Sequence, residues 1–213
     1  TMPTPAIVWF RLDLRLADNP ALQAAVKHGG AVIPVFIHDP EAEGSWQPGG
    51  ASNWWLHFAL EDLAEQLAKA GSPLIIRNGH SLTELKKLVE ETGAGLVTWN
   101  RRHEPLIIER DTQVKTSLRN GGLQAESFNG NLLHEPHLVK TLAGNPFQVF
   151  TPFWKNCLPN LKFGEPLKAP KKLPPFDKPL KSVAIAKLDL LPKIKWDGEF
   201  PAAWDPTRKG AEK

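Results

Sequence analysis

The sequence predicts an α/β domain in which a parallel β-sheet is covered by helices on both faces. Three observations predict it: five short runs typical of strands, a stretch of helical length between each consecutive pair, and glycines where those stretches end. A strand that is buried on both faces has a continuous apolar sequence. The first two runs, over residues 6–10 and 31–37, have this form. Runs joined by helices require crossovers, which are right-handed and make the joined strands parallel.

The first strand is expected over residues 6–10, which read AIVWF. Asn19 and Pro20 then begin a helix, because asparagine caps helix N-termini and proline suits the first helical position. Two glycines at residues 29–30 end that helix. A second strand is expected directly after them, over residues 31–37.

The second helix is expected over residues 52–70. It ends at Gly71, because glycine readily adopts the left-handed conformation of a helix C-terminus. Its leucines recur at helical spacing and share one face, as in an amphipathic helix: Leu56, Leu60, Leu63 and Leu67. A third strand follows over residues 74–76.

The remaining elements complete the sheet. Ser81 and Glu84 have the spacing of a capping box, in which hydroxyl and carboxylate each accept a hydrogen bond from a free backbone N–H. The helix they begin precedes a strand over residues 96–99, a helix over residues 106–119 and a strand over residues 123–128. Five strands joined by four helices predict a doubly wound, Rossmann-like domain with a five-stranded parallel sheet.

Length and composition fit one such domain followed by a tail. A chain of 213 residues with 41% hydrophobic residues can bury one core of this size. The net charge of +3 is uneven: residues 160–213 hold 12 Lys or Arg and 7 Asp or Glu, giving +5, and the remainder gives 14 minus 16, or −2. Nine of the 20 prolines lie between Pro159 and Pro206. An extended connector rich in proline and lysine explains both features, and contact with DNA phosphates is the alternative reason for the charge.

Several functional classes are excluded or disfavoured. The single cysteine, Cys157, excludes an internal disulfide, and the seven histidines show no spacing typical of a metal site. No apolar run reaches the roughly 18 to 20 residues that a membrane span needs, and residues 1–5 do not resemble a signal peptide. We therefore expect a cytoplasmic protein. The motifs G-x-G-x-x-G and G-x-x-x-x-G-K-[ST] are absent, which argues against an NAD site or a phosphate loop.

Charged residues follow the first strand instead. They are two arginines and two aspartates: Arg11, Asp13, Arg15 and Asp18. In doubly wound sheets ligands bind at the carboxyl ends of the strands, so these side chains could clamp an anionic ligand. They could equally pair with one another and order a loop. Both interpretations stay open on the residues alone.

Residues 9–22, WFRLDLRLADNPAL, resemble the opening motif of photolyases and cryptochromes. Three further segments agree with the family in order: residues 50–57, 99–105 and 144–155. The last of them, GNPFQVFTPFWK, is similar to a run found in microbial pyrimidine-dimer photolyases. The resemblance covers roughly residues 5–206.

The resemblance implies a division of labour. Residues 5–158 would form the α/β domain that holds a light-harvesting antenna pigment, which is a folate, a deazaflavin or a flavin mononucleotide. Residues 159–206 would be the connector, and residues 207–213 the start of a helical domain that binds FAD and damaged DNA. In the family, excited and reduced FAD passes an electron to the cyclobutane dimer, which then splits. No catalytic residue is therefore expected in this chain, and the protein is expected to be monomeric.

Residue by residue, the resemblance implies seven antenna residues: Arg11 after the first strand, Phe36 and Asp39 at the end of the second, Ser52 and Asn53 at the start of the second helix, and Asn100 and Glu104 after the fourth strand. Glu104 would accept hydrogen bonds from ring N–H or amino groups of the pigment. The alternative is a carboxylate that only stabilises the start of the next helix.

The expected site is a cleft at the carboxyl ends of the strands. Asp39, Asn100 and Glu104 are expected to converge there, with Arg11 and Phe36 at the wall. Deazaflavin-binding relatives often carry an acid where Arg102 stands, which weakens the deazaflavin assignment.

Two other functions remain open. A cryptochrome-type light sensor would share this whole domain, and nothing in these residues excludes it. A stand-alone pigment- or nucleotide-binding module without catalysis is the other. The stand-alone module predicts a polar surface, whereas the two-domain enzyme predicts an apolar face that the second domain covers.

Overall fold

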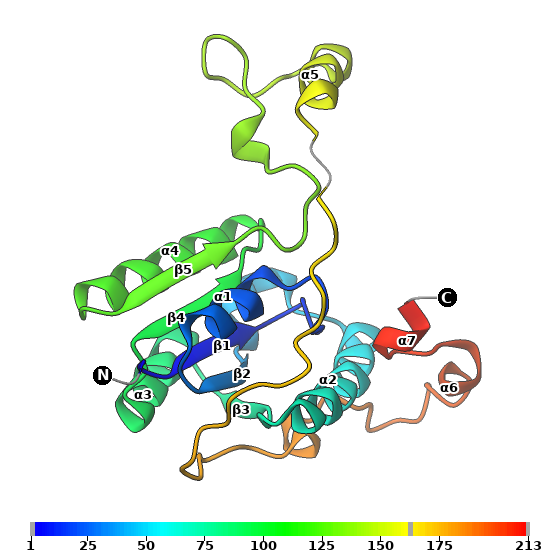
Figure 1. Cartoon of the computed structure of the whole chain (residues 1–213). Coiled ribbons are helices and arrows are strands. Elements are labelled where there is room, and N and C mark those ends of the chain that lie inside the picture. Colours follow the sequence, from blue (N-terminus) through cyan, green and yellow to red (C-terminus); the bar gives the residue numbers. More distant parts are fainter. Residues whose placement is uncertain (1–2, 162–163, 212–213) are drawn as a thin grey trace.

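The computed structural model describes residues 3–161 and 164–211. Five strands form one all-parallel sheet in the order β3-β2-β1-β4-β5, shown in Figure 1. The strands are β1 (Ala6–Phe10), β2 (Val32–His38), β3 (Ile75–Asn78), β4 (Leu96–Asn100) and β5 (Gln124–Phe128). The joining helices are α1 (Pro20–His28), α2 (Gly50–Ala70), α3 (Ser81–Thr92) and α4 (Pro105–Asn120). The strand order reverses once, between β1 and β4, so the doubly wound, Rossmann-like fold predicted from the sequence is confirmed.

The sheet separates two hydrophobic cores. Successive side chains of a strand point to opposite faces, and β1 therefore serves both cores. Val8 and Phe10 pack with the buried residues of α1 and α2, whereas Ile7 and Trp9 pack with those of α3 and α4. This burial on both faces explains why the central strands are apolar throughout.

The start of α1 forms as predicted. The Oδ1 atom of Asn19 accepts a hydrogen bond from the N–H of Leu22 at 3.0 Å, and Pro20 is the first residue of the helix. Gly29 ends α1 with a φ of 88°, a backbone conformation that disfavours a residue with a Cβ. The predicted boundaries of the other helices and strands lie within two residues of the observed ones.

The predicted capping box at the start of α3 is wrong. The hydroxyl of Ser81 donates a hydrogen bond to Oδ2 of Asp39 at 2.6 Å, and the N–H of Ser81 donates to the same oxygen at 2.8 Å. Glu84 instead forms an ion pair with Lys87 at 2.7 Å. The acceptor for the first turn of α3 therefore comes from the end of β2, which fixes the position of Asp39.

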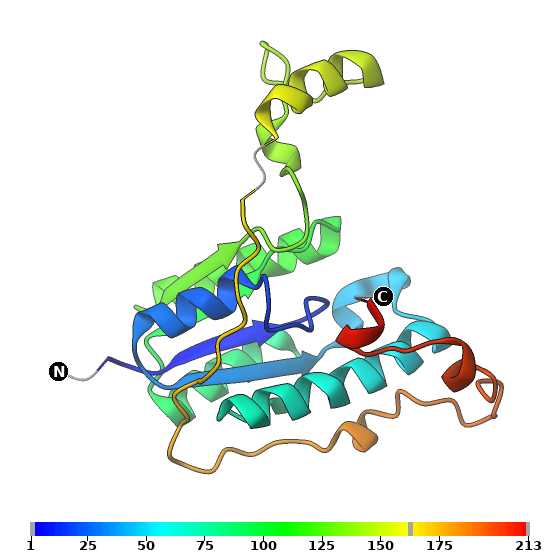
Figure 2. The ribbon, with the colours of Figure 1, turned by 45° about the vertical axis from the view of Figure 1, so that its right-hand side comes forward.

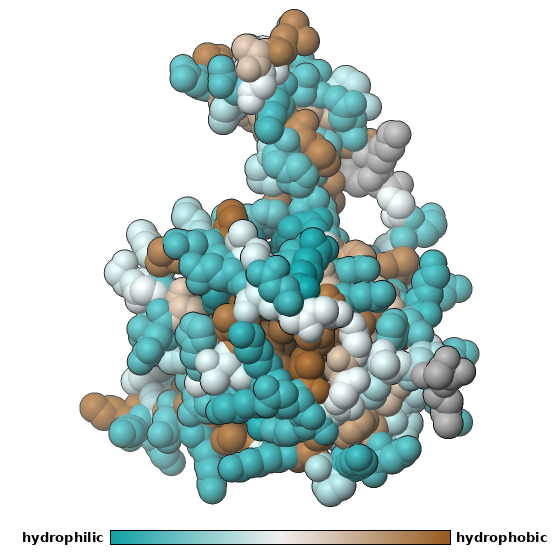
Figure 3. Space-filling model, turned by 90° about the vertical axis from the view of Figure 1, so that its left-hand side faces the viewer, coloured by the Kyte–Doolittle hydropathy of each residue, from teal (hydrophilic) through white to brown (hydrophobic). Residues whose placement is uncertain are grey.

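Residues 129–160 leave the sheet and form an arm that projects away from it (Figures 1 and 2). The arm contains the short 3₁₀ helices η2 (Pro136–Leu138) and η3 (Leu158–Asn160) and the helix α5 (Phe150–Cys157). Figure 3 shows the arm standing above the rest of the molecule, with hydrophobic residues at its tip.

The connector after the arm returns to the sheet domain and packs against it. Leu173, Leu188 and Leu190 are buried in the core that contains α1 and α2. The N–H of Val183 donates to the carbonyl of Ile76 at 2.9 Å, so the connector covers the free edge of β3. The connector thus lies extended over the domain, as expected, but it also supplies part of the core.

Residues 185–211 contain three more short helices, η4 (Ile185–Leu188), α6 (Phe200–Ala203) and α7 (Arg208–Ala211). Figure 2 places α6 and α7 beside α2. Across the described parts of the chain, no helix is both long and apolar enough to span a membrane.

Leu173→Ala tests whether the connector is a structural part of the domain. The side chain of Leu173 is 2% exposed, so we expect its removal to lower the free energy of unfolding by about 2 to 4 kcal/mol in a urea titration. Leu167→Ala is the matched control on the same connector, because Leu167 is 40% exposed, and it should cost less than about 1 kcal/mol. Equal losses for the two variants would contradict the structural role.

Candidate functional site

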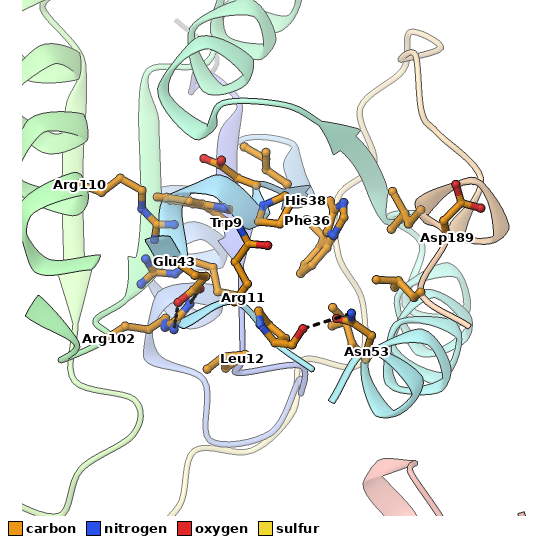
Figure 4. Close-up of a pocket in the computed structure, with 18 residues that line it drawn as sticks. Trp9, Arg11, Leu12, Phe36, His38, Glu43, Asn53, Arg102, Arg110 and Asp189 are labelled. Atoms are coloured by element: carbon orange, nitrogen blue, oxygen red, sulfur yellow. Dashed lines mark hydrogen bonds and ion pairs between the residues drawn. The ribbon is translucent and has the colours of Figure 1, made fainter. Parts of the chain in front are cut away.

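A cavity of about 190 Å³ opens at the carboxyl ends of β1 and β2 (Figure 4). The short 3₁₀ helix η1 (Pro40–Trp46), the start of α2 and the connector near residues 188–190 complete its wall. The apolar part of the lining consists mainly of Trp9, Phe36, Ile37, Leu56, Leu188 and Leu190. The charged and amide side chains of the lining are Arg11, Asp39, Glu43, Gln47, Asn53, Arg102, Arg110 and Asp189, together with His38. Ligands of doubly wound sheets bind at this edge, so the cavity is the candidate site.

The structure brings four of the seven expected site residues to this cavity: Arg11, Phe36, Asp39 and Asn53. Asp39 reaches it from the end of β2, where its hydrogen bonds to Ser81 hold the carboxylate in place. Asn53 reaches it from the first turn of α2, and its side-chain amide donates to the carbonyl of Pro48 at 3.3 Å.

The other three expected residues do not line the cavity, so the expected convergence of Asp39, Asn100 and Glu104 is not observed. Ser52 faces a neighbouring cavity of about 410 Å³, which it lines together with Trp55 and Thr207. The difference from Asn53 follows from helix geometry, because consecutive residues of α2 point in directions about 100° apart.

Asn100 is buried in a polar network instead of facing a ligand. Its Nδ2 donates to Oδ2 of Asp13 at 2.6 Å and to Oδ1 of Asn19 at 2.9 Å. Its Oδ1 accepts from the N–H of Ala21 at 3.2 Å, and its backbone carbonyl accepts from the guanidinium of Arg11. The side-chain amide is therefore occupied within the protein.

Glu104 turns toward Arg102 rather than into the cavity. Its Oε1 lies 2.7 Å from a guanidinium nitrogen of Arg102, and its Oε2 accepts from the N–H of His103 at 3.0 Å. Burial alone would raise the pKa of the Glu104 carboxyl, but the hydrogen bonds and charge of Arg102 bring it below the ordinary value. The same guanidinium forms two hydrogen bonds to Glu43, at 2.5 and 3.0 Å. Glu104 thus helps to hold Arg102, which does line the cavity.

A second ionic cluster lies behind the cavity, around Trp9. The Asp111 carboxylate accepts from Arg11 at 2.6 Å and from Arg110 at 2.8 Å. Both guanidinium groups lie over the Trp9 ring, with their Cζ atoms 4.7 and 4.9 Å from its centroid. Burial lowers the pKa of Arg11, although the charge of Asp111 acts in the opposite direction. The charged residues after β1 therefore pair mainly within the protein.

Sequence reasoning missed several residues of the cavity. Glu43 and Arg110 belong to none of the motifs, and Trp9 is expected only as part of the first strand and of the motif over residues 9–22. The connector residues Leu188, Asp189 and Leu190 gave no signal, because the connector has no periodicity from which a buried position could be predicted. Position along the chain could have indicated Glu43, since it lies in η1, the segment that follows β2.

The cavity combines apolar walls with a few fixed hydrogen-bonding groups. Such a lining suits a planar ring system that has polar atoms at its edge. Where the structure describes the side chains, no group of three or more His, Cys, Asp and Glu residues could hold a metal ion.

Comparison with known proteins gives the family. Residues 6–173 match the family model described as DNA photolyase. The chain is 44% identical over 208 residues to the deoxyribodipyrimidine photo-lyase of Agrobacterium fabrum, a match that covers 97% of this chain and 43% of that protein. It is also 36% identical over 219 residues to cryptochrome-2 of Arabidopsis thaliana, covering 100% of this chain and 36% of the relative. The chain thus spans less than half the length of these relatives.

Solved structures agree with this match. The crystal structure of a bacterial class III photolyase from Agrobacterium tumefaciens superimposes with a TM-score of 0.91 at 43% identity, over 100% of this chain and 44% of that one. A cryptochrome from Synechocystis sp. PCC6803 has the same fold, with a TM-score of 0.80 at 24% identity, over 92% of this chain and 42% of that chain. The match of sequence and fold over nearly the whole chain shows that it belongs to the DNA photolyase family.

Proposed function

We propose that this chain is the amino-terminal, pigment-binding part of a light-dependent deoxyribodipyrimidine photo-lyase that repairs cyclobutane pyrimidine dimers in DNA. The observation that carries the proposal is the 44% identity to the Agrobacterium fabrum photo-lyase over 97% of the chain. Flavin and pterin-type chromophores are typical of the family. FAD, the damaged DNA and the chemical step would belong to the part of the protein beyond these 213 residues.

In this proposal the cavity at the ends of β1 and β2 holds the antenna pigment. Phe36, Leu56 and Leu190 would contact the faces of the ring system, and Arg11 and Asn53 would contribute polar contacts at its edge. Glu104 would act indirectly, by holding Arg102 in the wall. Asn100 would also act indirectly, because it fixes the position of Arg11.

Asp39 favours a folate among the three candidate pigments. Its hydrogen bonds from Ser81 both end at Oδ2, and no described residue donates a hydrogen bond to its other carboxylate oxygen. The pteridine ring of a folate presents an N–H and an amino group side by side, and a carboxylate can accept from such donors. A flavin or deazaflavin presents its ring N–H between two carbonyl oxygens, which a carboxylate repels.

The surface of the arm supports a protein of two parts over a stand-alone module. Several large apolar side chains on and near α5 are well exposed, among them Val149, Phe150, Trp154 and Leu158, with Phe150 at 70%. The rings of Phe150 and Trp154 stack on each other, 6.2 Å apart. Clustered apolar groups of this kind are typical of surfaces that another part of a protein covers. We propose that the FAD-binding part covers this one.

A cryptochrome-type light sensor is the second candidate. The 36% identity to cryptochrome-2 over the whole chain favours it, and its pigment-binding part would share the cavity described above. We propose repair as the first candidate because the identity to a photo-lyase, 44%, is higher than the identity to this cryptochrome. Dimer splitting by the full-length protein separates the two functions, because a sensor without repair activity would leave the dimers intact.

Titration of the chain with a folate, a deazaflavin and flavin mononucleotide, followed by fluorescence, tests the pigment site. We expect the folate to bind most tightly. Asp39→Asn should weaken folate binding by about 1.5 to 3 kcal/mol, because it removes an ionised acceptor but leaves an oxygen for Ser81. Asp62→Asn makes the same change in charge next to the second cavity and should leave folate affinity unchanged. Equal affinities of wild type and Asp39→Asn would contradict the site.

The 213-residue chain should not split cyclobutane dimers. With added FAD, reductant and near-ultraviolet or blue light, dimer content measured by chromatography should remain constant, because the proposed electron donor and lesion pocket lie outside these residues. The full-length protein under the same light is the positive control. Repair by the chain alone would contradict the division of labour.

A further inference from the structure

Trp9 lies at the back of the pigment cavity in an unusual electrostatic setting. Its side chain is 1% exposed, yet it forms part of the cavity lining. Two guanidinium groups lie over its ring, at 4.7 Å for Arg11 and 4.9 Å for Arg110. Figure 4 shows Trp9, Arg11 and Arg110 among the side chains around the cavity.

We propose that Arg110, together with Arg11, prevents Trp9 from quenching the excited pigment by electron transfer. The inference rests on the proposed function, since it requires a pigment in this cavity. An excited pterin or flavin can take one electron from a neighbouring indole, which gives a pigment radical anion and a tryptophan radical cation. The electron then returns, both partners are restored, and the light energy is lost as heat instead of reaching the flavin.

The two arginines oppose the first of these steps. A positive charge close to the indole raises the energy of a second positive charge on the ring, and burial strengthens this effect because water screens it poorly. The cation–π attraction stabilises the neutral ring and is lost when the ring becomes a cation. Both contributions make Trp9 harder to oxidise.

The negative charges nearby determine which arginine matters most. Asp111 pairs with both guanidinium groups and offsets one of their charges. Asp13 also lies close to Arg11 and accepts a hydrogen bond from its backbone N–H at 2.9 Å. Without Arg110, the single positive charge of Arg11 would face the two carboxylates of Asp111 and Asp13. Arg110 therefore supplies the positive charge that keeps the surroundings of the ring from being net negative.

The indole N–H of Trp9 favours the same effect. Trp9 is buried, and none of the described residues accepts a hydrogen bond from its Nε1–H. Among the described residues, none is therefore placed to take the proton when the ring loses an electron. The oxidised ring stays a cation, and the repulsion by the guanidinium groups persists for as long as the electron is absent.

The fluorescence lifetime of bound pigment tests this inference. The 213-residue chain is saturated with methenyl-tetrahydrofolate, so that a change in affinity does not alter the bound fraction, and the lifetime is measured for the wild type and three variants. Arg110→Gln should shorten the lifetime by about twofold or more, because one unit charge beside the ring is lost. Arg110→Lys keeps the charge and should retain most of the lifetime. The double variant with Trp9→Phe and Arg110→Gln lacks the electron donor, and its lifetime should return to that of the wild type.

The other outcomes are equally decisive. Equal lifetimes in wild type and Arg110→Gln would overturn the inference, and so would a short lifetime that persists in the double variant. A lifetime as short in Arg110→Lys as in Arg110→Gln would overturn the role of charge. If neither the folate nor flavin mononucleotide binds the wild-type chain, the proposed function itself fails and this inference fails with it. Circular dichroism of each variant verifies that the fold is retained.

Discussion

The buried amide of Asn100 ties together the elements that form the candidate site. It donates to Asp13 in the loop after β1 and to Asn19, the N-cap of α1, and it accepts from the N–H of Ala21 in the first turn of that helix. A buried amide that loses such partners carries the full desolvation penalty, about 1 to 3 kcal/mol for each unsatisfied group. The network also needs close backbone approach, since a Cβ on Gly130 would lie 2.6 Å from the Asn100 side chain.

The position of Arg11 follows from this network. Its guanidinium donates to the carbonyl of Asn100 at the end of β4 and to the carboxylate of Asp111 on α4. Arg11 thereby links the end of a central strand to the helix that covers the face of the sheet opposite α1. The Trp9 ring lies against the Arg11 guanidinium, and Arg110 lies against the same ring and pairs with Asp111. The charged motif after β1 is therefore largely a scaffold, and the side chains with capacity to bind a ligand come mainly from the end of β2 and the start of α2. Of the four charged residues in this motif, Arg11 alone also lines the cavity, where it would contact the edge of the pigment.

Much of the fold could be predicted because local signals and tertiary packing agree. The central strands are buried on both faces, and the Asn19-Pro20 helix start is a local feature of the chain. The prediction of a capping box is wrong because Asp39, which is distant in sequence, supplies the acceptor for the N–H of Ser81. The buried leucines of the connector were missed for a related reason, since an extended segment with irregular turns places single residues in the core without a period. For Asn100 and Glu104, residue type and position could not reveal whether a polar group faces a ligand or another side chain.

A crystal structure of the chain with bound folate tests the central claim most directly. We predict that the pteridine ring lies in the cavity at the ends of β1 and β2, with its amino group and ring N–H within hydrogen-bonding distance of Asp39 and its face against the apolar wall that includes Phe36. Density for the pigment in the neighbouring cavity lined by Ser52 and Trp55, or elsewhere on the surface, would contradict the assignment of the site.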